Sequence, residues 1–244
     1  MEEKSFQNLL KTDIIKETFN GGFMSISKKN LILICVGFLF LTTLACTSLD
    51  AILPNTRIDD SPDSFKFSDD FSQESSGWEI GDFDGGVIGY SQGKYFVTSV
   101  GSGSTMWGSA GRSFENVSIE VSAEQISAPS NNNNDYGVIC RLQRDGGGYY
   151  GLISGDGFFA ILRESGGDSY DVLVDWTASN HIRQGNSQNQ LGLSCVGSKI
   201  SLFVNDQLLA ETSDSMYSSG DIGFTATSYE LEETEVQFDD VIVK

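Results

Sequence analysis

Residues 136–163 read YGVICRLQRDGGGYYGLISGDGFFAILR, and this stretch decides the fold. Three short apolar runs, 136–142, 149–154 and 158–163, are separated by turns that contain Asp-Gly. Asp-Gly turns between strands of roughly 4–8 residues are typical of antiparallel β-hairpins. The stretch therefore predicts three consecutive strands of one antiparallel sheet.

The same pattern continues on both sides of this stretch. Residues 117–121 (VSIEV) alternate apolar and polar side chains, as a half-buried strand does. Gly197-Ser198 links the runs 191–196 and 200–204, and Asn205-Asp206 opens another tight turn. No segment keeps a helical apolar spacing for two turns with caps. Residues 65–244 are therefore predicted to form an all-β domain, an antiparallel sandwich or jelly roll.

A short export signal precedes this domain. Lys28 and Lys29 precede the apolar run 31–41, which is followed by Thr-Thr-Leu-Ala-Cys46. A basic patch, an apolar run and a small residue before a cleavage point, in this order, are typical of a signal peptide. The apolar run is short for a membrane span. The cysteine after Leu-Ala resembles a bacterial lipoprotein signal, although Thr43 replaces the usual aliphatic residue. We expect a lipid on Cys46; an uncleaved anchor and a plain secretory signal are the alternatives. All three send the rest of the chain out of the cytoplasm, and with the lipid we expect the domain in the bacterial cell envelope, anchored to the membrane.

The segments beside the signal have different characters. Residues 1–23 are polar, and Met24 with Ser25-Ile26-Ser27 would be a normal signal start, so we expect translation to begin at Met24 and the signal to span 24–46. Residues 47–64 hold two of the three prolines, with Asp and Ser, and are interpreted as a linker.

The charge of the chain limits its partners. The sequence has 15 Lys and Arg against 34 Asp and Glu, for a net charge of −19. Nucleic acids and anionic lipid headgroups need basic surfaces, so nucleic acid is excluded as a partner. The charge is compatible with cations or neutral ligands, or simply with solubility.

Two of the four cysteines, Cys140 and Cys195, lie in apolar strand-like runs of the domain. In an exported chain such a pair favours a disulfide. The alternative is two buried free thiols that act as small hydrophobic side chains.

The order of several motifs resembles the concanavalin A-like lectin/glucanase superfamily, including laminin-G-like modules. The matching residues are 67–71 (FSDDF), 76–78 (SGW), 136–141, 149–154, 205–208 (NDQL), 220–224 (GDIGF) and 236–241 (VQFDDV). The resemblance implies two curved antiparallel sheets, adjacent first and last strands, and a face that binds carbohydrate in many members. It leaves the ligand undefined, because one fold hosts many functions.

Two-carboxylate glycoside hydrolysis is not indicated by any single strand. Catalytic glucanases of this superfamily carry Glu-x-Asp-x-x-Glu on one strand, and the sequence has no such match. Residues 79–84 and the glutamates at 230–235 have the wrong spacing. The sequence therefore leans toward binding rather than catalysis.

Sugar binding needs flat aromatic faces and polar groups for the hydroxyls. Strand alternation places Tyr136, Val138, Cys140 and Leu142 on one face, opposite Ile139 and Arg141. The groove residues that we predict from this pattern are Arg141, Tyr149, Arg163 and Trp176. The polar loop 127–135, with four consecutive asparagines, is predicted to be a solvated connection, with ligand contact as the alternative.

A structural calcium site is a further prediction. Asp69 and Asp70 lie near the start of the domain and Asp239 and Asp240 near its end, on strands that the resemblance makes neighbours. Calcium favours carboxylate, carbonyl and water oxygens. The alternative is that one aspartate caps backbone amides and the others are solvated.

These observations predict a membrane-tethered lipoprotein with a non-catalytic β-sandwich that binds a glycan or a surface protein. A glycoside-acting enzyme with carboxylates from separate strands is one alternative. The other is a structural envelope lipoprotein without a small ligand.

Overall fold

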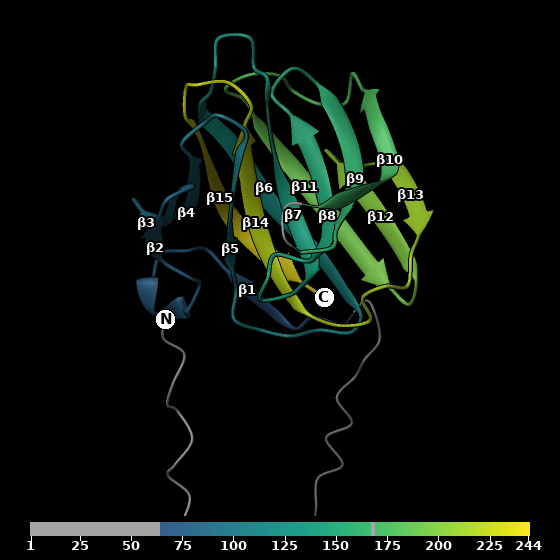
Figure 1. Cartoon of the computed structure of the whole chain (residues 1–244). Helices are drawn as coiled ribbons and strands as arrows, with labels where there is room; N and C mark the ends of the chain where they lie inside the picture. Colours follow the sequence, from purple (N-terminus) through teal and green to yellow (C-terminus); the bar gives the residue numbers. More distant parts are fainter. Residues whose placement is uncertain (1–63, 167–168) are drawn as a thin grey trace, which may run out of the picture. The chain divides into compact units, whose positions relative to one another are not determined.

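The computed structural model describes residues 64–166 and 169–244 (Figure 1). The predicted extension, signal segment and Cys46 lie outside the described residues, as does the linker apart from Ser64. No helix in the described part of the chain is long and apolar enough to cross a membrane.

Antiparallel strands in two sheets make up the described domain, with one short 3-10 helix, η1 (Glu74–Ser76). The six-stranded sheet has the order β10-β9-β8-β7-β14-β5. Its strands are β5 (Ser104–Ser109), β7 (Asn134–Leu142), β8 (Gly148–Ser154), β9 (Phe158–Glu164), β10 (Tyr170–Ala178) and β14 (Asp221–Ser228). The three consecutive strands predicted from residues 136–163 are β7, β8 and β9, paired as expected.

The nine-stranded sheet has the order β13-β12-β11-β6-β15-β4-β3-β2, and β1 pairs with β15. Its strands are β1 (Phe67–Asp69), β2 (Gly81–Phe83), β3 (Gly86–Ser91), β4 (Lys94–Ser99), β6 (Val117–Ser127), β11 (Gln188–Val196), β12 (Lys199–Val204), β13 (Gln207–Ser213) and β15 (Thr234–Val243). Phe67 on β1 lies opposite Val243 on β15, so the first and last strands are neighbours, as the resemblance implies. The predicted all-β sandwich is confirmed (Figure 1).

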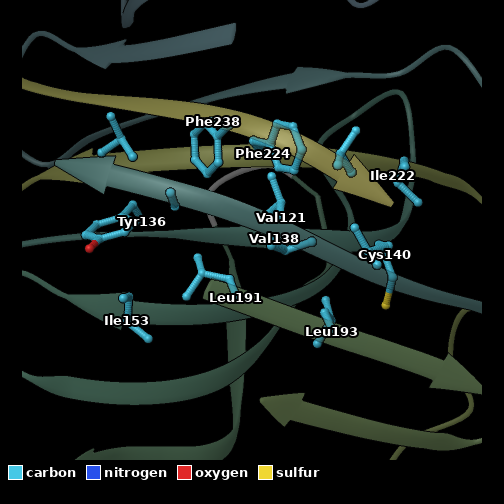
Figure 2. Packing of buried hydrophobic residues seen from close by; sticks show 14 of the residues in the cluster. Val121, Tyr136, Val138, Cys140, Ile153, Leu191, Leu193, Ile222, Phe224 and Phe238 are labelled. Carbon is cyan, nitrogen blue, oxygen red and sulfur yellow. The ribbon is translucent and has the colours of Figure 1, made fainter. Parts of the chain in front are cut away.

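The hydrophobic core lies between the two sheets. Alternate residues of the strands in each sheet point into it, and Figure 2 shows Val138 on β7 among Val121 on β6 and Leu191 on β11. Phe224 stacks on Phe238, with ring centroids 4.4 Å apart. Gly151 on β8 lets the sheets approach, because a Cβ there would lie 2.8 Å from Cδ1 of Leu193.

A disulfide joins the sheets. Cys140 on β7 is bonded to Cys195 on β11, and both side chains are fully buried. The two residues lie 55 apart in sequence, so the bond closes a long loop of the unfolded chain.

A β-bulge changes the face on which the end of β7 presents its side chains. Ile222 on β14 pairs with Cys140 and Asp221 pairs with Leu142, so Arg141 has no partner of its own in this ladder. The φ of Arg141 is 54°, in the left-handed region. The extra residue reverses the alternation: Leu142 joins the outer face with Ile139, and Arg141 turns inward. The predicted common face of Tyr136, Val138, Cys140 and Leu142 is therefore right up to Cys140 and wrong at Leu142.

Candidate functional site

The outer face of the six-stranded sheet, which faces away from the nine-stranded sheet, is hollowed into a groove of about 520 Å³. Every strand of this sheet contributes to the groove. The strand residues that line it are Ser104, Thr105 and Trp107 of β5, Asp135 of β7, Tyr150 and Leu152 of β8, Leu162 and Glu164 of β9, Tyr170 and Trp176 of β10, and Thr225 and Thr227 of β14. Asp145 and Gly146 of the β7–β8 turn and Tyr229 after β14 also line it.

The floor of the groove is apolar and rigidly held. Strand alternation on β8 sends Tyr149 into the core and Tyr150 to the outer face. Tyr150 packs with Leu152 and Leu162, and its hydroxyl donates to the carbonyl of Gly146 at 2.7 Å. This hydrogen bond ties the β7–β8 turn to the floor.

Gly146 also sets the position of one wall. Its φ is +85°, which favours glycine, and a Cβ there would lie 3.4 Å from Nε1 of Trp107. The turn therefore needs glycine for its backbone conformation, while the contact of a Cβ with the indole would be an ordinary one. The Trp107 indole packs against the apolar floor together with Trp176.

Four aromatic side chains line the groove without being buried. Trp107 and Trp176 are partly exposed, Tyr170 is 60% exposed and Tyr229 is 48% exposed. Large aromatic residues usually lie in the core, where they bury much of their area. Their concentration at one open hollow marks it as a surface for a ligand with apolar faces.

Asp135 is the most unusual polar residue of the groove. It is 1% exposed, and one carboxylate oxygen, Oδ2, accepts a hydrogen bond from the Tyr229 hydroxyl. The Thr227 hydroxyl is hydrogen-bonded to the Thr105 hydroxyl at 3.0 Å, and because either of the two can donate, it can also donate to the Asp135 carboxylate. The other oxygen, Oδ1, has no hydrogen-bond partner among the described residues. Burial raises the pKa of Asp135 to about 6, although the hydroxyls of Tyr229 and Thr227 act to lower it.

A second hollow of about 440 Å³ lies beside the groove and shares part of its lining. Asp135, Tyr170, Trp176 and Tyr229 line both hollows. The second hollow adds Asn133, Asn134, Ser154, Asp156 and Phe158. The end of the predicted asparagine loop therefore reaches this site, and Asn134 and Asp135 are not loop residues but the buried start of β7.

The charged side chains that line the two hollows are acidic. Their lining includes the carboxylates of Asp135, Asp145, Asp156 and Glu164. Among the residues that the structure describes, no lysine, arginine or histidine lines either hollow. The site is therefore acidic, in keeping with the net charge of the chain.

Of the four predicted groove residues, the structure places only Trp176 in the groove. Arg141 is 2% exposed, and its guanidinium donates to the carbonyls of Glu115, Gly197 and Tyr217. The prediction that it lines a groove is wrong, because the bulge turns it inward.

Tyr149 and Arg163 meet at Asp214 rather than in the groove. The Tyr149 hydroxyl donates to Oδ1 of Asp214 at 2.6 Å, and Arg163 forms ion pairs with Asp214 and Asp171. Burial acts to raise the pKa of Asp214, but its hydrogen bonds from Tyr149 and the Met216 amide and the Arg163 charge leave this pKa lowered. This network connects β8, β9, β10 and the segment after β13. Its hydroxyl and carboxylate groups already have partners, whereas Nε of Arg163 has no hydrogen-bond partner among the described residues.

The four predicted calcium ligands do not form a recognisable cluster. Asp69 accepts hydrogen bonds from the Phe71 amide and the Trp78 indole. Asp70 accepts from Ser72, and Asp239 accepts from the Asp240 amide. Among the described residues, no group of three or more His, Cys, Asp or Glu side chains could hold a metal. Calcium binding stays an untested prediction.

The sequence analysis does not single out Asp135 or Tyr170. It also does not predict that Asp135 pairs with Tyr229. One signal was present: Asp135 shares alternation with Gly137 and Ile139, on the face opposite Tyr136 and Val138. The run of asparagines before it made the position look like part of a loop.

Comparisons with known proteins bear on the fold. No protein-family model matches the chain, and no curated protein matches it. Among solved structures, a Bacillus subtilis protein of unknown function with a galectin-like fold has 12% identity and a TM-score of 0.55, covering 74% of this chain and 95% of its own. The catalytic domain of an endo-1,3-β-glucanase (laminarinase) from Thermotoga petrophila has 9% identity and a TM-score of 0.51, covering 74% and 96%. A Bacteroides ovatus GH16 protein from a mixed linkage glucan PUL, in complex with a G4G4G3G product, has 11% identity and a TM-score of 0.50, covering 73% and 99%. At these identities the likeness shows the fold alone, a concanavalin-like jelly roll.

Proposed function

We propose that this protein is an extracytoplasmic lipoprotein that binds carbohydrate in the groove on its six-stranded sheet. The observation that carries the proposal is the set of open aromatic faces, Trp107, Trp176, Tyr170 and Tyr229, around the buried Asp135. The solved structures with this fold that are named for glucans lend support, as does the predicted signal that ends at Cys46.

The groove suits a sugar for physical reasons. One side of a pyranose ring is apolar, and it stacks on an aromatic face with loss of water from both surfaces. The hydroxyls then need hydrogen-bonding groups, which the carboxylates, the threonines of β14 and the asparagines of the second hollow can supply. The floor is fixed by packing and by the Tyr150 hydrogen bond. The groove therefore loses little conformational entropy when a ligand binds.

A glycan array probed with the purified full-length chain tests this function. We expect binding that is lost when Trp107 and Trp176 are both replaced by alanine. Phe203→Ala is the matched control, because Phe203 is an aromatic residue of β12, 37% exposed, on the other sheet. Glycan binding that survives the double tryptophan variant, or no glycan binding by any form, would contradict the proposal. The second result would favour a structural envelope role.

Hydrolysis is the second candidate function, and one observation favours it. Asp135 is a buried carboxyl in a groove with a pKa of about 6, a property of general acids, and Glu164 on β9 is a second carboxylate of the same groove. Release of reducing ends from a bound glycan tests it. Hydrolysis predicts release that is abolished in Asp135→Asn, whereas binding alone predicts no release by either form.

The lipid anchor needs its own test. We expect the chain to enter the membrane fraction and to incorporate labelled palmitate, and Cys46→Ala to lose both properties. A chain that remains membrane-bound without label would indicate an uncleaved anchor instead. Peptide mapping of the precursor checks the translation start, since peptides from residues 2–16 would contradict a start at Met24.

A further inference from the structure

We propose that the groove selects glycans that carry free amino groups, with the ammonium of an amino sugar seated against Asp135. This inference rests on the proposed function, and it names the class of ligand that the site takes.

The first argument is the unmet hydrogen-bonding capacity of Asp135. Its side chain is almost fully buried, it lines both hollows, and Oδ1 has no partner among the described residues. A buried carboxylate oxygen without a partner is costly, because it has lost its water and gained no hydrogen bond in return. A ligand that brings hydrogen-bond donors, and above all a positive charge, relieves this cost.

The second argument is the combination of charge and aromatic faces. Asp145, Asp156 and Glu164 line the same hollows as Asp135, and no basic side chain among the described residues lines them. Such a site repels uronic, sulfated and sialylated sugars, since like charges in a low-dielectric groove raise the free energy. It attracts ammonium groups, which aromatic faces also bind through cation–π contacts within about 6 Å.

The third argument separates an organic cation from a metal ion. The acidic residues of the lining come from two strands, β7 and β9, and from the β7–β8 and β8–β9 turns, and in the described part of the chain no three metal-ligating side chains come together. Metal ions need several ligands at short distance, whereas an ammonium on a sugar needs one carboxylate and a face to lie on. The distribution of charge fits repeated amino groups along an oligosaccharide.

Titration calorimetry with matched oligosaccharides tests the inference. The probes are a β-1,4-linked hexamer of glucosamine and the hexamer of N-acetylglucosamine, which differ only in the charge and acetylation of the amine. We expect the cationic hexamer to bind at least tenfold more tightly to the full-length chain. Asp135→Asn should reduce that preference to threefold or less. Asp206→Asn, in the exposed β12–β13 turn of the other sheet, removes the same charge outside the groove lining and should leave the preference unchanged.

Two further measurements keep the test decisive. If Asp135→Asn does not fold, Asp145→Asn at the exposed rim should weaken the cationic hexamer twofold to threefold and leave the neutral hexamer unchanged. A hexamer of lysine measures attraction to the net charge of the chain. Lysine-hexamer binding as tight as that of the glucosamine hexamer overturns the inference.

The outcomes distinguish the two proposals. A neutral hexamer bound as tightly as the cationic one, and lost in the Trp107 and Trp176 double variant, overturns the amino-sugar inference and leaves carbohydrate binding intact. No binding of either hexamer, together with an empty glycan array, overturns both.

Discussion

The two faces of the six-stranded sheet use aromatic residues in opposite ways. On the inner face, Phe224 of β14 stacks between Trp78 and Phe238, with centroid distances of 4.6 and 4.4 Å, and all three rings are buried. On the outer face, Trp107 and Trp176 lie over an apolar floor and remain partly exposed. Neighbouring residues of one strand serve both faces, since Phe224 points into the core and Thr225 lines the groove.

This difference shows how the fold separates stability from binding. The inner face gains free energy from burial against the second sheet, and its rings have no surface left for a ligand. The outer face has a second apolar cluster, but no sheet among the described elements packs on it. Truncations on the inner face should therefore act on unfolding, and those on the outer face on ligand affinity.

The largest expected effect is on the inner face. Phe224→Ala removes the central ring of the stack and leaves a cavity, so we expect the free energy of unfolding to fall by about 4 kcal/mol. Denaturant unfolding followed by tryptophan fluorescence measures it. A loss below about 1 kcal/mol would break the comparison, because the inner aromatics would then be as dispensable for stability as outer ones.

The disulfide is the next test of how the inner face is held. Replacing both Cys140 and Cys195 by alanine should lower the free energy of unfolding by about 3 kcal/mol, since the unfolded chain loses a cross-link over 55 residues. Dithiothreitol should destabilise the wild type by a similar amount and leave the double variant unaffected. Equal stability of the wild type with and without reductant would count against the bond.

A smaller effect on stability comes from the carboxyl of Asp135, which is buried and also lines the groove. The folded pKa of Asp135, about 6, lies above the ordinary value of 3.8, so the folded protein holds more protons than the unfolded chain between these values. The stabilisation is therefore complete below pH 3.8 and is lost as the pH rises through about 6. We expect the contribution of Asp135 to the free energy of unfolding to fall by about 2–3 kcal/mol over this window.

Asp135→Asn isolates this contribution from the other carboxyls of the chain. The variant should lack this part of the pH dependence in denaturant unfolding, while Asp206→Asn should keep it. Identical pH profiles for the wild type and Asp135→Asn would show that Asp135 is not held in an unfavourable environment.

The fold could be predicted from the sequence because its signals are local. Each hairpin of residues 136–163 carries its own turn and its own alternation, and these determine the pairing of β7, β8 and β9. The sequence does not predict β2, because a three-residue strand that begins with Gly81 and is followed by Asp84-Gly85-Gly86 resembles a turn. Such short strands depend on the neighbouring sheet rather than on their own residues.

The site could be predicted only in part, since it depends on contacts that are distant in sequence. The sequence predicts Trp176 as a groove residue because its aromatic ring offers a flat face to a sugar. Arg141 was misplaced because one bulge residue reverses the alternation, and nothing in the run 136–142 marks it. Sequence reasoning does not find Asp135, because the hydroxyls that contact it belong to Thr227 and Tyr229, roughly 90 residues further along the chain.

The smallest expected effect on stability is on the outer face. Trp176→Ala removes an aromatic wall shared by both hollows, so we expect glycan affinity to fall by about 2 kcal/mol, roughly 30-fold in Kd. Stability should change by less than about 1 kcal/mol, because the indole is partly exposed and packs at the edge of the outer cluster. Calorimetric titration and denaturant unfolding on the same preparation measure both quantities, with Phe203→Ala as the exposed aromatic control.

If Trp176→Ala unfolded as readily as Phe224→Ala, the outer face would be a second core rather than a binding surface. If affinity fell with stability unchanged, the two faces would be energetically separate, as their different exposure indicates.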